Sequence, residues 1–537
     1  MLLSLPEQQA IPGVDTRPGP LRDWLDALPY VDCEKTTAKV IERLRDINHQ
    51  LIPAGLRLEL LAGFRHAYER LHETLRDCAR QQDMTQPRAL ELLAELTETL
   101  AFGHKYALRD ALDERQRWGR VKQLAEAVNY SGYFLAQQLL CRYQAYHPVS
   151  DQHWRELGDL VRFAEAQNLP PTRDSRLPYS PGELHVPSGY VQLALLRLAD
   201  PYRLPSGQIW ETYGYLAGKL AQAPLLSHLD DEAGTPSGIY PVSLDREPQQ
   251  ALPAPRSGVE RNSWRWIDAR ELLRGVQLDL ERIAPGGSPH RAGFSRHLTA
   301  AEASQLLGRL LWQWTHSADR KSPRFNSTQS VEVAPGLAAA YYFLNGCQPF
   351  DPRDYAPPED EDGLDDALGL RRRTAGPAEQ FRLVSCPTRN RSGGGLALRL
   401  DGIHDMTLRV GDLLLLNAPG AQPDKTDWLL GVVRWLVRQD GAGAELGVQY
   451  VARNATPAVV RATSGTHQAP APALANTLTL ANGDSLPVLI TSRGVYRDQS
   501  ILELHHADQT RQIRQIRCER LLETASGYDR FSYDPLD

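Results

Sequence analysis

One short segment of the sequence combines residue types that can bind a nucleotide. Asn390-Arg391-Ser392-Gly393-Gly394-Gly395 is followed by a short β-prone run, Leu-Ala-Leu-Arg-Leu, at 396–400. The Asn390 amide can pair with the donor–acceptor edge of a base, and the Ser392 hydroxyl can face a phosphate. Glycine lets the backbone turn and approach a ligand closely. The same pattern is also that of an ordinary hairpin turn, so a binding function needs support from other residues.

Two groups of arginines can supply positive charge to such a site. Arg320 and Arg324 stand four residues apart, in Arg-Lys-Ser-Pro-Arg. A guanidinium is planar and always charged, and it can bind a phosphate or the O6/N7 edge of guanine. A rival cluster, Arg371-Arg372-Arg373, lies nearer to Asn390 but lacks the four-residue spacing. We prefer the first pair, because the triple directly follows an acidic stretch whose charge it can balance.

Together these residues resemble the PilZ domain, a family of small β-barrels that act as cyclic di-GMP receptors. The family pattern is R-x-x-x-R followed later by [D/N]-x-S-x-x-G, which Arg320/Arg324 and Asn390/Ser392/Gly395 match. Three downstream segments fit the same family: 408–412 (LRVGD), 431–435 (GVVRW) and 445–450 (ELGVQY). The resemblance covers about residues 318–455. The 65 residues between Arg324 and Asn390 exceed the usual spacing of the family, and an acidic insertion at 348–370 with the apolar stretch before it accounts for the excess.

The resemblance implies a receptor for cyclic di-GMP and assigns roles to its residues. Arg320 and Arg324 are expected to bind guanine and phosphate groups, Asn390 and Ser392 to line the pocket, and Gly395 to permit the turn. The secondary candidates are Arg371, Arg372, Arg373 and Arg391. The arginine loop is expected to reorder when nucleotide binds. The alternative is a scaffold protein whose degenerate barrel binds no nucleotide.

The long helical region before the barrel also resembles the receptors of the FimW type. That resemblance implies a bacterial signalling protein that regulates type IV pili, motility or surface attachment. It further implies a protein partner of the helical region, such as the pilus machinery, which could recruit the chain to the cell pole or the inner-membrane surface. Six scattered cysteines, none of them in a C-x-x-C pair, predict free thiols in a reducing cytoplasm.

The sequence motifs do not indicate an enzyme. The GGDEF, EAL and HD-GYP signatures of enzymes that make or cleave cyclic di-GMP do not occur. The segment 214–220 superficially matches a P-loop, but its glycines stand one residue too close and Leu220 replaces the required Ser or Thr. His505-His506 has no third ligand at metal spacing. We therefore expect no catalysis, no metal and no cofactor apart from the nucleotide ligand.

The sequence patterns of the helices and strands that must hold this site predict a multidomain α+β protein. Apolar residues recur every three or four positions within 56–80, which is typical of an amphipathic helix, whereas short β-prone segments with Gly, Asn and Asp turns fill the chain beyond 380. We predict four regions: an α-helical domain at 1–225, a small mixed α/β region at 226–317, a PilZ-like antiparallel β-barrel at 318–460 and a small C-terminal β-domain at 475–537, after a linker at 462–474.

Composition and charge limit the possible partners. The 537 residues are 42% hydrophobic, and 60 basic against 66 acidic side chains give a net charge of −6. This balance argues against a protein that binds DNA or RNA through a broad basic face. We expect no transmembrane segment and no signal peptide, because no apolar run is long enough and the N-terminus lacks a basic head. Segment 348–370 carries eight carboxylates and one arginine, so the remaining chain is nearly neutral.

Overall fold

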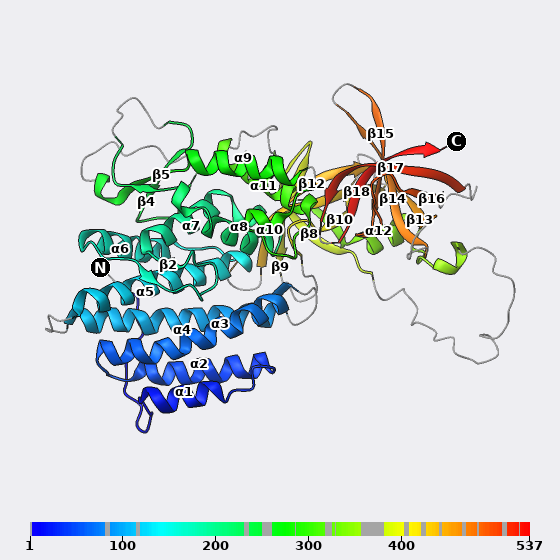
Figure 1. The fold of residues 1–537 in the computed structure, drawn as a ribbon. Coiled ribbons are helices and arrows are strands. Elements are labelled where there is room, and N and C mark those ends of the chain that lie inside the picture. Colours follow the sequence, from blue (N-terminus) through cyan, green and yellow to red (C-terminus); the bar gives the residue numbers. More distant parts are fainter. Residues whose placement is uncertain are drawn as a thin grey trace, which may run out of the picture. The chain divides into compact units, whose positions relative to one another are not determined.

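The computed structural model divides into two compact units, residues 1–319 and 320–537, which we describe separately (Figure 1). It describes the whole chain except residues 1–2, 81–85, 114–118, 230–235, 250–259, 285, 317–324, 328, 356–380, 402–407, 420–425, 440–442, 464–468, 481–482, 507–512, 526 and 537. The predicted fold class is confirmed: a helical N-terminal part precedes two β-barrels.

The first unit is built mainly from helices. Its described helices are α1 (Pro18–Asp26), α2 (Cys33–His49), α3 (Ala54–Arg80), α4 (Gln86–Asp113), α5 (Arg120–Gln144), α6 (Asp151–Ala166), α7 (Val186–Leu198), α8 (Gln208–Ala217), α9 (Arg270–Ile283), α10 (Pro289–Ala292) and α11 (Ala300–Thr315), with short 3₁₀ turns at Pro201–Arg203, Leu220–Gln222 and Glu260–Ser263. No helix in the described part of the chain has both the length and the apolar character needed to cross a membrane.

The predicted apolar stripe of 56–80 forms the buried face of α3. Its members are all nearly inaccessible to solvent: Leu58, Leu60, Leu61, Phe64, Ala67, Tyr68, Leu71 and Leu75. Helices α3, α4 and α5 pack in sequence order, and Figure 1 shows α1 to α4 lying side by side. Helix α5 is buried along most of its length, so it forms the centre of the unit. Helical periodicity alone thus predicted which face of α3 is hidden.

Residues 226–317 belong to the same compact unit as the helices. Their sheet, in the order β3 (Leu225–Leu226), β5 (Trp264–Asp268) and β4 (Ile239–Ser243), lies within the first unit, which also contains a two-stranded sheet of β1 (Thr172–Arg173) and β2 (Glu183–Leu184). The Tyr215 hydroxyl of α8 donates to Asp279 of α9 at 2.9 Å, and the Trp314 indole of α11 donates to the Leu195 carbonyl of α7 at 3.1 Å. These buried contacts explain why no boundary between compact units falls at the predicted position, 225.

The second unit contains two barrels and few helical residues. Its strands are β6 (Phe325–Asn326), β7 (Ser330–Pro335), β8 (Val384–Ser392), β9 (Gly395–Asp401), β10 (Leu413–Pro419), β11 (Thr426–Arg438), β12 (Gly443–Arg453), β13 (Thr456–Ala462), β14 (Ala471–Thr479), β15 (Ser485–Thr491), β16 (Ile501–His506), β17 (Ile513–Thr524) and β18 (Asp529–Leu536). Helix α12 (Leu337–Leu344) follows β7, and a 3₁₀ turn forms at Pro352–Tyr355.

The two barrels share one strand topology. The first barrel has the ring order β7-β8-β9-β12-β11-β10, and it closes because β8 pairs with β9 as well as with β7. The short strand β6 pairs with the end of β8. The second barrel closes as β13-β14-β15-β18-β17-β16. Numbering the strands of each barrel from one to six gives the ring order 1-2-3-6-5-4 in both. The C-terminal part is therefore a second barrel with the connectivity of the first.

The second barrel begins earlier than its predicted start at residue 475. Strand β13 pairs with β14 and β16, which places residues 456–460 in the second barrel rather than the first. The predicted linker at 462–474 ends inside β14, which starts at Ala471. The prolines and small residues of this stretch predicted a linker, but residues 471–474 belong to a strand that pairs with its neighbours β13 and β15.

Helix α12 packs between the two barrels. Buried residues of α12, including Ala340 and Tyr341, share one hydrophobic cluster with β10 and β11 of the first barrel and with β13, β14 and β15 of the second. Figure 1 shows α12 beside β13 and β14. The apolar stretch that lengthens the predicted spacing between the two motifs is therefore an inserted helix, and its burial joins the barrels.

Candidate functional site

The predicted Asn-x-Ser-x-x-Gly segment forms a tight β-hairpin. Strands β8 and β9 pair up to Ser392 and Gly395, so Gly393 and Gly394 form the exposed tip. The Ser392 hydroxyl donates to the Gly395 carbonyl at 3.2 Å. The Tyr450 N–H donates to the Gly394 carbonyl at 3.0 Å, which attaches the tip to β12. The hairpin is thus held rigidly at one end of the first barrel.

A β-bulge determines which way the motif side chains face. Thr388 pairs with Leu398, but Asn390 pairs with Ala397, so Arg389 is one extra residue in β8. Directly paired residues share a face of the sheet, and successive residues alternate. Since Thr388 and Leu398 are buried, Asn390 lies on the opposite, outer face. The bulge therefore presents Asn390 and Ser392 on the outside of the barrel, where a ligand can reach them.

Pairing across five strands aligns a row of outer-face residues that includes Asn390. In the order of the sheet the row is Asn326, Asn390, Ala397, Gly447 and Trp435. A Cβ on Gly447 would lie 1.8 Å from the Trp435 indole nitrogen, so the ring lies directly against Gly447. The partly exposed indole can stack on a flat base. Sequence reasoning missed Trp435 as a site residue, because its position opposite Gly447 is set by the pairing of β11 with β12.

Gly395 has a more specific role than the predicted one of permitting a turn. A Cβ at this position would lie 2.2 Å from the Val448 carbonyl oxygen of β12. The close approach of β9 and β12 therefore requires glycine at 395. At Gly393, in the turn itself, an added Cβ would meet no atom within 4 Å.

Of the candidate arginines, Arg391 lies within the described residues and the others do not. Arg391 pairs with buried Leu396, so it lies on the inner-face row at the barrel end rather than beside Asn390. Arg320, Arg324 and the triple Arg371-Arg372-Arg373 lie outside the described residues. Phe325, the residue directly after Arg324, pairs with Arg391, and the following Asn326 pairs with Asn390.

A charged pair lies close to the hairpin. The Arg434 Nε donates to the Gln449 Oε1 at 2.8 Å, and Gln449 pairs with Gly395. The same guanidinium binds the Glu523 carboxylate, with Nη2 and Oε2 3.1 Å apart. Burial alone lowers the pKa of Arg434, but the hydrogen bonds and charge of Glu523 outweigh burial and raise that pKa above its ordinary value. The pair keeps a protonated guanidinium near the hairpin, with its charge balanced by the Glu523 carboxylate.

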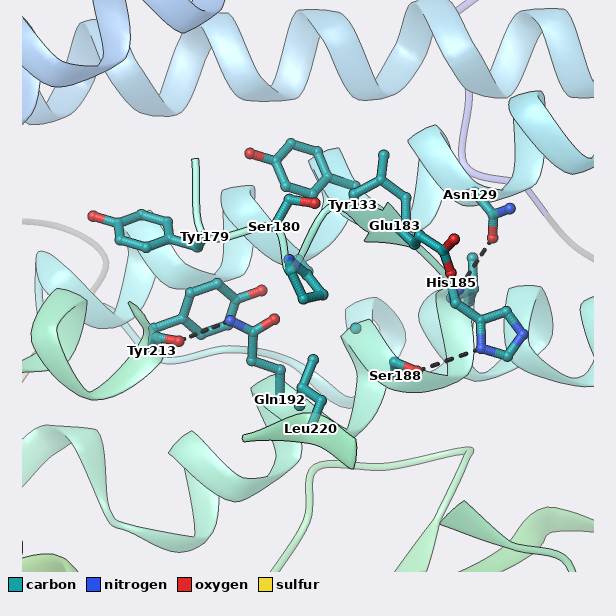
Figure 2. A pocket seen from close by; sticks show the side chains of 16 residues that line it. Asn129, Tyr133, Tyr179, Ser180, Glu183, His185, Ser188, Gln192, Tyr213 and Leu220 are labelled. Atoms are coloured by element: carbon teal, nitrogen blue, oxygen red, sulfur yellow. Dashed lines mark hydrogen bonds between the residues drawn. The ribbon is translucent and has the colours of Figure 1, made fainter. Parts of the chain in front are cut away.

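A small cavity in the helical unit provides a second candidate (Figure 2). It has a volume of about 30 Å³ and is lined mainly by α5, α7, α8 and the segment 179–185. The Gln192 amide donates to the Tyr213 carbonyl at 2.8 Å, and the Asn129 side-chain oxygen, Oδ1, accepts from the Val186 N–H at 3.1 Å. The cavity is large enough for a water molecule but far too small for a nucleotide.

A larger hollow on the same unit is electrostatically balanced. It has a volume of about 660 Å³ and includes Tyr130, Asp174 and two arginines in its lining. Arg173 is paired with Glu183 at 3.4 Å, and Arg176 lies 3.8 Å from Asp174. Each arginine therefore has a carboxylate partner, so this hollow has little net positive charge to hold an anion.

Comparisons with known proteins match both units. The family model described as "Cyclic-di-GMP receptor FimW, N-terminal domain" matches residues 19–229, and the model described as "Cyclic-di-GMP receptor FimW, middle PilZ domain" matches residues 353–457. A curated protein of Pseudomonas aeruginosa, "Cyclic-di-GMP receptor FimW", is 23% identical over 586 aligned positions, covering 98% of this chain and 92% of the relative. The matched PilZ range begins after β7, so Arg320 and Arg324 lie outside it.

Proposed function

Because the chain belongs to the FimW family of PilZ-domain proteins, we propose that it is a receptor for cyclic di-GMP and acts without catalysis. The observation that carries this proposal is the row of residues on the outer face of the first barrel. The bulge in β8 pairs Asn390 with Ala397, and the next pairs in the row are Ala397 with Gly447 and Gly447 with Trp435. An amide for a base edge and an aromatic face for stacking suit a purine nucleotide.

The arginines that complete the site are, in this proposal, Arg320 and Arg324. Arg324 directly precedes Phe325, and β6 pairs with the Asn390 end of β8. The triple at 371–373 leads instead to Phe381, whose ring lies 5.3 Å from Tyr342 of α12. From there β8 must run from Val384 to Asn390, about 20 Å at the usual rise per residue, before it reaches the motif. The path of the chain therefore favours Arg320 and Arg324 over the triple at 371–373 as the arginines that complete the site.

A comparison of two variants tests this choice. We expect Arg320→Ala/Arg324→Ala to weaken cyclic di-GMP binding at least about a hundredfold, because two charge-assisted contacts are lost. We expect a much smaller loss for Arg371→Ala/Arg372→Ala/Arg373→Ala, although this variant removes more positive charge. Calorimetric titration of the intact protein and both variants at one salt concentration measures the difference. A larger loss in the triple variant would overturn the assignment.

We further propose that the helical unit is the output surface and binds a protein partner of the type IV pilus or surface-attachment machinery, which could recruit the receptor to the cell pole. The name of the relative supports the receptor interpretation over that of a scaffold without nucleotide. Ligand must then favour one arrangement of the chain over another. Hydrogen exchange with and without cyclic di-GMP should show protection changes in the helical unit, and changes confined to the barrels would contradict this output.

A further inference from the structure

The bulge in β11 places one arginine at the edge of the proposed nucleotide site. Val433 pairs with Val448 and Trp435 pairs with Gly447, so Arg434 is the extra residue between them. Its Nε donates to Gln449, which pairs with Gly395 of the hairpin. The guanidinium is therefore two strands away from Gly395, within reach of a phosphate bound over the outer face.

The second barrel supplies the partner of this arginine. Both terminal nitrogens of Arg434 donate to the carboxylate of Glu523 on β17. Strand β17 occupies the same place in the second ring as β11 in the first, and its pairing with β18 is also irregular beside Glu523. A neighbouring contact joins the barrels as well, because Arg530 donates to the Val451 carbonyl at 3.3 Å.

The Arg434–Glu523 pair is accessible enough to exchange partners. About a third of the Arg434 side chain remains exposed (32%), against 17% for Glu523. Gln449 on β12 accepts a hydrogen bond from the Arg434 Nε, and Tyr528 and Arg530 are further titratable groups that interact with the pair. A phosphate at the hairpin could share or take over the exposed edge of the guanidinium without unfolding either barrel.

We propose that Arg434 is a further nucleotide-binding residue, and that Glu523 of the second barrel competes with the ligand phosphate for its guanidinium. This inference rests on the proposed function of the hairpin site. Thermodynamic linkage makes the effect reciprocal: if Glu523 weakens nucleotide binding, then bound nucleotide weakens the Arg434–Glu523 contact. The apolar core around α12 keeps the barrels joined while this polar contact changes.

Substitution of Glu523 tests the competition. Glu523→Gln keeps an oxygen that can accept from Arg434 but removes the charge. We expect it to tighten cyclic di-GMP binding about threefold to tenfold, with a larger effect at low salt. The matched control is Glu503→Gln, which removes an equally buried glutamate paired with Arg461 in the same barrel. The control should bind within about twofold of the unchanged protein.

A double-mutant cycle separates this mechanism from a general charge effect. In an Arg434→Gln background, whose own affinity should be reduced, Glu523→Gln should no longer tighten binding. Unchanged or weaker binding in Glu523→Gln, or tightening that persists without Arg434, would overturn this inference but leave the proposed function standing. If the unchanged protein binds no cyclic di-GMP under the same conditions, the proposed function is itself overturned.

Discussion

Single residues in the first barrel have roles that depend on exact backbone geometry. Gly395 leaves room for the Val448 carbonyl, Gly447 for the Trp435 ring, and the bulge at Arg389 turns Asn390 outward. The residue types of the motif were readable in the sequence. The bulge and the approach of β12 were not, because they depend on strand pairing between distant parts of the chain.

Gly395→Ala tests the close approach of β9 and β12. The added Cβ would clash with a backbone carbonyl, which has no flexible end to move away. We expect a loss of about 1–3 kcal/mol in the free energy of unfolding, together with weaker nucleotide binding. Chemical denaturation and binding titrations measure both. Gly393→Ala is the matched control, since nothing lies within 4 Å of its added Cβ; equal losses in both variants would contradict the account.

Asp412 is predicted to make stability depend on pH. Burial raises its pKa from 3.8 to about 6, although the Arg409 N–H donates to its carboxylate at 2.7 Å and opposes the shift. The folded state therefore holds the proton more tightly than the unfolded state. The stabilising effect of protonation is complete below about pH 4 and is lost as pH rises through about 6.

Asp412→Asn should remove this dependence. At pH 7 we expect the variant to be more stable by about 1–3 kcal/mol, and near pH 4 we expect little difference. Denaturant unfolding of both proteins across this pH range measures the change. Asp401→Asn provides a control with the same charge change at an exposed carboxylate. A stability difference that does not vary with pH would contradict the role assigned to Asp412.

At the scale of elements, α12 is the feature that the sequence least revealed. The predicted acidic insertion implied that the chain between the two motifs is a loop, and residues 337–344 read only as a short apolar stretch. In the structure this stretch is a helix buried on two sides by different barrels. By contrast, the helical stripe of α3 was predictable, because its residues lie on one face through local periodicity alone.

Truncation of Tyr341 tests whether α12 joins the barrels. The Tyr341 side chain is 1% exposed, and we expect Tyr341→Ala to cost about 3–5 kcal/mol. Hydrogen exchange should show both barrels losing protection together, since they share one core. Tyr342→Ala, at the partly exposed neighbouring position, should cost clearly less. Loss of protection confined to one barrel would show that α12 does not couple them.

At the scale of the whole molecule, the net charge of −6 does not describe the proposed site. The predicted acidic insertion at 348–370 carries more negative charge than the chain as a whole, so the remainder is close to neutral. This distribution allows an arginine-lined anion site in an acidic protein. The fold class and the hairpin motif followed from sequence, whereas the second barrel's topology and its contact with the site required the strand pairing.

Deletion of residues 351–366 tests whether the acidic segment competes with the ligand. If its carboxylates reduce the positive potential around the arginines, the deletion should tighten cyclic di-GMP binding about threefold or more at low salt and less at high salt. Titrations at two ionic strengths measure this. An affinity that is unchanged at low salt would discard the idea.

The most direct test of the central claim is a calorimetric titration of the intact protein with cyclic di-GMP, with GMP as the ligand control. We predict saturable binding of cyclic di-GMP and much weaker binding of GMP. In Asn390→Ala/Ser392→Ala, which removes the outward polar groups of the hairpin, we predict that cyclic di-GMP binding is lost. Undiminished binding in that variant, or no binding to the intact protein, would contradict the claim that this face of the first barrel is a nucleotide site.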